Sequence, residues 1–203
     1  MKSLEKKDQD DYKPTGLGID QNRIINNLDL LYSMIIGIIG GIISPLVPFS
    51  LLIKVWYPLT GGTQLVSGHH LIWGAIIYGL TRKKQTIIIT MSAKGLLEFL
   101  FNDPWGLLIV FVNIFEGLFL ALGFILVEKV GEGETNLGWA IAGAIGNFFQ
   151  APFFWILNQR FYLHWTLWTI SFSFAIISGM LIVGLLGRAL KNSLIKAGVP
   201  TTY

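Results

Sequence analysis

The chain has 203 residues, of which 53% are hydrophobic and 13% are charged, and its mean hydropathy is +0.61. A soluble domain carries about 25% charged residues, so this composition indicates a membrane protein. The net charge of +3 is small and dispersed, and no basic run alternates with aromatic residues, which argues against nucleic-acid binding. Because the chain has no cysteine, disulfides and thiolate metal sites are excluded.

The first 27 residues are polar and lack the apolar core and small-residue cleavage site of a signal peptide. We therefore expect residues 1–27 to form a cytoplasmic tail. Residues 28–190 are expected to form the transmembrane domain, and residues 191–203 a second cytoplasmic tail.

Six apolar stretches follow in chain order, separated by polar or turn-forming breaks. A helix needs about 20 apolar residues to cross a hydrocarbon core, and these stretches reach or approach that length. The predicted fold class is therefore an all-α integral membrane protein with six transmembrane helices. Pro45 and Pro48 should unwind the outer end of the first span, and Pro152 should shorten the fifth. The predicted spans are 28–53, 64–81, 85–101, 105–127, 137–158 and 164–188.

Basic residues predict the orientation of these spans. Six crossings place both termini on one side, and that side carries most of the lysines and arginines, whereas the other carries only Lys54 and Arg160. The positive-inside rule then makes both termini cytoplasmic, in a multi-pass protein of the cell membrane. The basic residues on the side of the termini are Lys2, Lys6, Lys7, Lys13, Arg23, Arg82, Lys83, Lys84, Lys129, Arg188, Lys191 and Lys196.

Polar side chains interrupt four of the apolar stretches at a similar depth, in the outer half of the bilayer. Three pairs have i,i+3 or i,i+4 spacing, so each pair shares one helical face. Charged groups in a bilayer usually face a bundle interior or a wet cavity. We therefore predict a substrate pocket that opens outward, and Trp73 and Trp105 are candidate ring-stacking or anchoring residues beside it. The polar candidates are Lys94, Glu98, Asn113, Glu116, Asn147, Gln150, His69 and His70.

Two acids and one lysine leave an anionic excess at this depth, which favours a cationic or polar heteroaromatic ligand. Alternatively, Lys94 and Glu98 simply neutralise each other, with a histidine satisfying Glu116. Adjacent His69 and His70 project about 100° apart on a helix, which does not favour a metal site. No phosphate-binding loop or hydrolase motif occurs, so we predict neither an enzyme nor a cofactor.

The same residues leave two other functions open. Lys94, Glu98 and Glu116 would also suit a proton relay in a stand-alone ion-coupled transporter. If the buried charges only pair with one another, the chain would instead be a membrane assembly protein. Gly37 and Gly41 in the first span allow close helix approach, either to a partner or within this bundle.

Three segments resemble substrate-binding S components of energy-coupling factor (ECF) transporters, specifically the YkoE-type thiamine and hydroxymethylpyrimidine group. The segments are "LLEFLFNDPWG" (Leu96 to Gly106), "FEGLFLALGF" (Phe115 to Phe124) and "ISGMLIVGLLGRALKNSLIKAGV" (Ile177 to Val199).

The resemblance implies a six-helix bundle with an outward vitamin pocket, which works with a transmembrane coupling subunit and two ATPase subunits. It also implies that Gly37 and Gly41 meet the coupling subunit and that Ser44 to Gly62 closes the pocket. Glu98 matches an acidic position of the group, and Glu116 stands where glutamine is more usual. Lys94 replaces a small apolar residue, which makes Lys94 the first candidate for a change of substrate, in which a neutral or partly anionic compound would pair with Lys94.

Overall fold

The computed structural model describes residues 24–46, 63–157 and 164–203. Its first two long helices in the bundle are α1 (Asn27–Ile43) and α3 (Gly68–Thr81), and the next three are α4 (Lys84–Leu100), α5 (Leu108–Lys129) and α6 (Asn136–Leu157). The last helical segment is one continuous run, from α7 (Trp165–Ser178) through the π-helix η4 (Gly179–Leu186) into α8 (Gly187–Lys196). Short 3₁₀ helices occur at η2 (Ser44–Leu46) and η3 (Thr63–Leu65).

These helices agree with the predicted stretches within a few residues at most ends, and the described chain is all-α. Helix α1 ends at Ile43 and tightens into the 3₁₀ helix that contains Pro45, as the proline predicted. Helix α6, by contrast, continues through Pro152 to Leu157, so the prediction that this proline shortens the helix was wrong. A proline removes only one helical hydrogen bond, and α6 packs along both α5 and η4.

The sixth segment is longer than predicted, because α8 continues to Lys196 rather than stopping near residue 188. Beyond α8 the chain folds back, and the backbone N–H of Thr202 donates to the carbonyl of Leu80, 3.1 Å away. Residues 191–203 are therefore partly helical and packed on the bundle, where the sequence predicted a tail.

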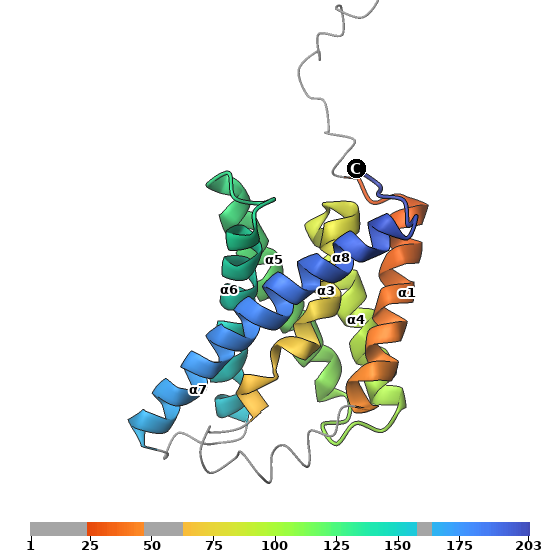
Figure 1. The fold of residues 1–203 in the computed structure, drawn as a ribbon. Coiled ribbons are helices and arrows are strands. Elements are labelled where there is room, and N and C mark those ends of the chain that lie inside the picture. The colour runs from red at the N-terminus through yellow and green to blue at the C-terminus, as the bar shows by residue number, and fades with distance from the viewer. Residues whose placement is uncertain (1–23, 47–62, 158–163) are drawn as a thin grey trace, which may run out of the picture.

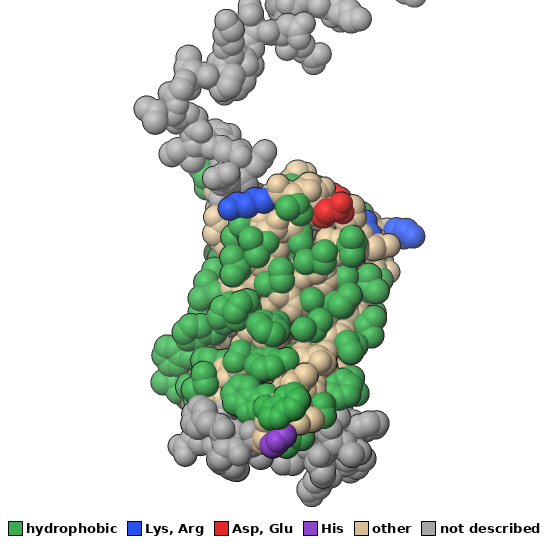
Figure 2. Space-filling model, turned by 90° about the vertical axis from the view of Figure 1, so that its left-hand side faces the viewer, with side chains coloured by type: hydrophobic (Ala, Val, Ile, Leu, Met, Phe, Trp, Pro, Cys, Tyr) green, Lys and Arg blue, Asp and Glu red, His purple; other side chains and the backbone are tan. Residues whose placement is uncertain are grey.

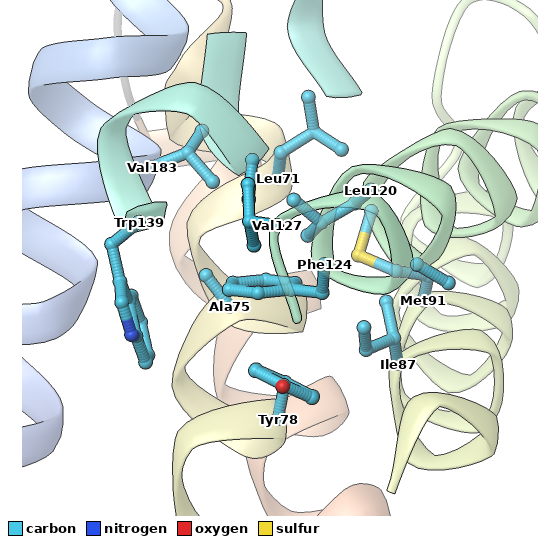
Figure 3. Close-up of a cluster of buried hydrophobic side chains, with 12 residues drawn as sticks. Leu71, Ala75, Tyr78, Ile87, Met91, Leu120, Phe124, Val127, Trp139 and Val183 are labelled. Carbon is cyan, nitrogen blue, oxygen red and sulfur yellow. The ribbon is translucent and has the colours of Figure 1, made fainter. Parts of the chain in front are cut away.

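Helix α3 lies at the centre of the bundle. It packs against α1, α4, α5, α6 and the η4–α8 segment, and nearly all of its side chains are buried from Leu71 to Thr81 (Figure 1). The main core cluster surrounds α3, with the Tyr78 and Phe124 rings stacked 3.9 Å apart between their centroids and Trp139 packed beside them (Figure 3). Because α3 is central, the residues at its first turn lie between the other helices.

The outer surface is apolar over the length of the helices. Figure 2 shows hydrophobic side chains covering the middle of one face, with lysine, arginine and acidic side chains only near one end. By length and composition, three described helical segments are able to cross a membrane, namely Asn27–Leu46, Leu108–Lys129 and Trp165–Lys196. The six-span topology remains a prediction for the shorter or more polar helices.

Candidate functional site

Lys94 and Glu98 are fully buried and form an ion pair, with 2.7 Å between Lys94 Nζ and Glu98 Oε1. Lys94 Nζ also donates to Asn113 Oδ1 at 2.7 Å, and Asn113 Nδ2 donates to Glu98 Oε2 at 2.7 Å. The three side chains therefore close a ring of hydrogen bonds between α4 and α5. Sequence spacing and depth predicted this grouping.

Close packing of α4 on α5 makes the ring possible. Gly95 lies between the two charged residues, and a Cβ added there would stand 2.9 Å from Val110 Cα and 3.0 Å from Asn113 Cβ. A larger residue at Gly95 would push the helices apart and move Asn113 away from Lys94 and Glu98. Asn113 Nδ2 is fixed further by donating to the Ile109 carbonyl at 2.9 Å.

The two histidines at the start of α3 face this ring. His70 Nδ1 lies 3.4 Å from Lys94 Nζ and 3.9 Å from Glu98 Oε1. The His69 ring stands edge-on to the His70 ring, with 5.5 Å between centroids. Both histidines are half-buried, so α3 supplies two polar rings beside the charged groups of α4.

Glu116 lies on α5 within electrostatic range of both Lys94 and Glu98. Its side chain is only 3% exposed, and neither carboxylate oxygen has a hydrogen-bond partner among the described residues. A buried carboxylate without a cation or donor is costly, because it loses its hydration and gains nothing in return. In the Lys94 cluster, which comprises Lys94, Glu98, Asn113, His70 and Glu116, Glu116 is therefore the carboxylate that has no hydrogen-bond partner in the described part of the chain.

Asn147 and Gln150 on α6 are also buried, but Asn147 has structural partners. Its Nδ2 donates to Ser67 Oγ and to the Ala175 carbonyl, both at 2.7 Å, so it ties α6 to the start of α3 and to α7. The Oδ1 of Asn147 and the Oε1 of Gln150 remain without a partner in the described part of the chain. The Ser67 and Ala175 contacts of Asn147 were not predicted.

The two candidate tryptophans lie apart from each other. Trp73 packs against α1, where a Cβ added at Gly40 would be 2.7 Å from the ring, and it stands edge-on to the His69 ring with 6.4 Å between centroids. It also lines an apolar groove between α1, α3 and α8. Trp105 is half-buried in the turn between α4 and α5, where its backbone N–H donates to Asp103 Oδ1 at 2.8 Å. Burial raises the pKa of the Asp103 carboxyl above its usual range.

Gly37 and Gly41 are buried against α4 inside the bundle. A Cβ at Gly37 would stand 2.7 Å from the Thr90 carbonyl oxygen, and one at Gly41 would stand 2.8 Å from Leu97 Cβ. This is the internal packing that the sequence left open as an alternative. Contact of these glycines with a partner subunit stays a prediction.

Sequence reasoning missed two buried polar features. Gln64 in η3 is 5% exposed, and its Oε1 has no partner in the described ranges, so it joins the polar side chains near the start of α3. Asp29 and Lys83 form a second buried ion pair, with 2.6 Å between Lys83 Nζ and Asp29 Oδ2. The capping box of Asn26 and Asp29 was a visible signal for part of this arrangement.

Comparison with known proteins supports a transport role for this bundle. Residues 28–149 match the family described as "ABC-type cobalt transport system, permease component". The chain belongs to this family. It is thus a membrane transport protein rather than an enzyme. A comparison with curated proteins found no match.

A solved structure described as "Crystal structure of an S-component of ECF transporter" superposes with a TM-score of 0.76. The match covers 87% of this chain and 88% of that chain at 20% sequence identity. At this identity the likeness establishes the fold, so the chain has the ECF S-component fold that the sequence resemblance implied.

The family description names cobalt, which directs attention to possible metal ligands. No group of three or more His, Cys, Asp or Glu side chains in the described ranges is arranged to hold a metal ion. The groups near Glu116 instead offer one carboxylate, an internally paired lysine and two rings.

Proposed function

We propose that the chain is the substrate-capture S subunit of an ECF-type importer and that it binds a vitamin-like or precursor molecule of the thiamine and hydroxymethylpyrimidine class. Family membership and the S-component fold support the coarse part of this proposal. The buried carboxylate of Glu116, which has no partner among the described residues, carries the finer part.

The charges of Lys94, Glu98 and Glu116 together support a cationic ligand. Lys94 donates to Glu98 and to Asn113 and lies beside His70, so its ammonium group is already engaged within the protein. Glu98 is likewise saturated by Lys94 and Asn113. With Lys94 and Glu98 neutralising each other, a cation bound beside Glu116 would pair with its carboxylate and favour the ionised form of that group.

The positions of the rings support a heteroaromatic ligand. His69 and His70, at the start of α3, lie beside the hydrogen-bonded ring of Lys94, Glu98 and Asn113. The face or edge of a histidine ring can contact a flat heterocycle. Thiamine unites an aminopyrimidine ring with a permanently cationic thiazolium ring. In this proposal the thiazolium pairs with Glu116, and the pyrimidine uses the amide and imidazole groups.

Energy for uptake would come from partner subunits, because the sequence has no nucleotide-binding loop. We propose a transmembrane coupling subunit and two ATPase subunits as these partners. The predicted lid, Ser44 to Gly62, lies outside the described residues except for Ser44–Leu46. Cytoplasmic termini and an outward-facing site remain part of the proposal.

Binding measurements on the purified protein in lipid nanodiscs test this proposal. Isothermal titration with thiamine, hydroxymethylpyrimidine and Co²⁺ should give the tightest binding for thiamine, since it alone combines the ring with an organic cation. Glu116→Gln should weaken thiamine binding about tenfold or more, because a charge-assisted contact is worth about 1.5–3 kcal/mol.

Glu132→Gln provides the matched control, because it makes the same charge change in the α5–α6 turn, where Glu132 accepts from Thr135. Equal loss in the Glu116 and Glu132 variants would contradict the assigned site. Binding of Co²⁺ without binding of either organic compound would overturn the proposed substrate class. Co-purification of the chain with a coupling subunit and ATPases tests the partner assignment separately.

A further inference from the structure

A second pocket lies at the end of the bundle where the C-terminus emerges, remote from the Lys94 cluster. It has a volume of about 460 Å³ and lies between the start of α4 and the end of α5. Small-molecule pockets commonly measure about 300–1,000 Å³, so it is large enough for a polar headgroup. Its lining residues are Arg82, Lys83, Lys84, Gln85, Ile125, Glu128 and Lys129.

The pocket keeps one positive charge after its internal ion pairs are counted. Lys84 pairs with Glu128, Arg82 with Glu134, and Lys83 with Asp29. These three pairs neutralise three of the four cations that line the pocket. Lys129, the fourth, is exposed and has no ion-pair partner among the described residues.

Hydrogen-bonding groups at the pocket also lack acceptors. Arg82 Nε is buried without a hydrogen-bond partner in the described part of the chain. Helix α4 begins at the same place, and its N-cap residue, Lys83, makes no side-chain capping bond. The first N–H groups of a helix have no partner within that helix and attract an anion. The start of α4 therefore favours an anion here, as Lys129 and Arg82 do.

An apolar strip on α5 leads to this pocket. Leu118, Leu122 and Leu126 are 44%, 39% and 42% exposed, and they recur every four residues on one helical face. Lys129 follows Leu126 by three residues, so the strip ends at the basic rim of the pocket. The molecule that fits both parts has an anionic head and a long apolar tail.

We propose that this pocket binds the headgroup of an anionic phospholipid, with the phosphodiester between Lys129 and Arg82 and an acyl chain along Leu118, Leu122 and Leu126. One phosphodiester carries one negative charge, which matches the one uncompensated cation. Basic pockets between transmembrane helices are known to favour anionic lipid headgroups. The site is independent of the substrate site and of the function proposed for it.

Native mass spectrometry on the detergent-purified chain tests the lipid site. The probes are phosphatidylglycerol, phosphatidylcholine and phosphatidylethanolamine with identical acyl chains, and inorganic phosphate. The chain should retain phosphatidylglycerol in preference to both zwitterionic lipids. Lys129→Gln should lower this retention about fivefold, since one lysine near a lipid surface contributes about 1 kcal/mol, and Lys129→Arg should preserve it.

Lys196→Gln is the matched control, because Lys196 is an exposed lysine at the end of α8 and does not line the pocket. Retention in this variant should equal that of the unchanged chain. An equal loss in the two lysine variants would show a general charge effect and overturn the site. Equal retention of all three lipids, or displacement of phosphatidylglycerol by inorganic phosphate, would overturn it as well.

Discussion

Two regions of the bundle bury charged side chains, and they satisfy them to different extents. Near the C-terminus, the Asp29 carboxylate accepts from Lys83 Nζ at 2.6 Å, from the Asn26 backbone N–H at 2.8 Å and from Thr202 Oγ1. In the Lys94 cluster, Glu98 is equally well paired, but Glu116 has no partner among the described residues. Full pairing is what a structural ion pair requires, whereas an unpaired carboxylate leaves a place for a ligand.

The Asp29 group and the Lys94 cluster also differ in the helices that they connect. The Asp29 group connects α1, the α3–α4 turn and the C-terminal residues, so it holds the end of the bundle together. The Lys94 ring connects only α4 and α5, and His70 of α3 lies beside it. We therefore expect substitutions near Asp29 to change stability and substitutions near Glu116 to change binding.

The largest expected effect comes from Asp29→Ala. Removing one partner of a buried pair leaves the Lys83 ammonium uncompensated and should lower the free energy of unfolding by about 3–5 kcal/mol. Unfolding in mixed detergent micelles, followed by circular dichroism, measures this loss. If thiamine binding in the folded fraction falls while stability stays unchanged, the assignment of Asp29 to structure is wrong.

Lys94→Met should have a smaller effect on stability, about 2 kcal/mol, because Glu98 keeps the hydrogen bond from Asn113 and lies near His70. Combining it with Glu98→Gln should recover part of the loss, since no lone charge then remains. A double-mutant cycle should give a coupling of roughly 1–3 kcal/mol. Additive losses in this cycle would contradict a direct ion pair.

Thr202→Val should have the smallest effect on stability among these variants. It removes one of the hydrogen bonds to Asp29 and should cost about 1 kcal/mol, with no change in substrate affinity. Thr201→Val is the matched control, because Thr201 is also half-buried and is adjacent in the chain. Equal thermal shifts in the two threonine variants would show that the Thr202 bond does not anchor the C-terminal residues.

Part of the candidate site was predictable from helical geometry alone. Lys94 and Glu98 are four residues apart and share a face, and the predicted depth placed Asn113 near them. The contacts of Asn147 were not predictable in this way, since Ser67 and Ala175 belong to other helices and are distant in sequence. Trp73 was placed beside the polar residues by its spacing from His69, and the two rings do stand edge-on with 6.4 Å between centroids, while the Trp73 ring also packs on Gly40.

Sequence by itself determined the membrane class and the positions of the helices, because these depend on composition, length and the 3.6-residue period. Tertiary structure decided which polar groups pair. It placed Asp29 on Lys83, Gly37 and Gly41 against α4, and Glu116 without a described partner. Pairing depends on how helices rotate and pack against one another, and no single helix specifies that arrangement.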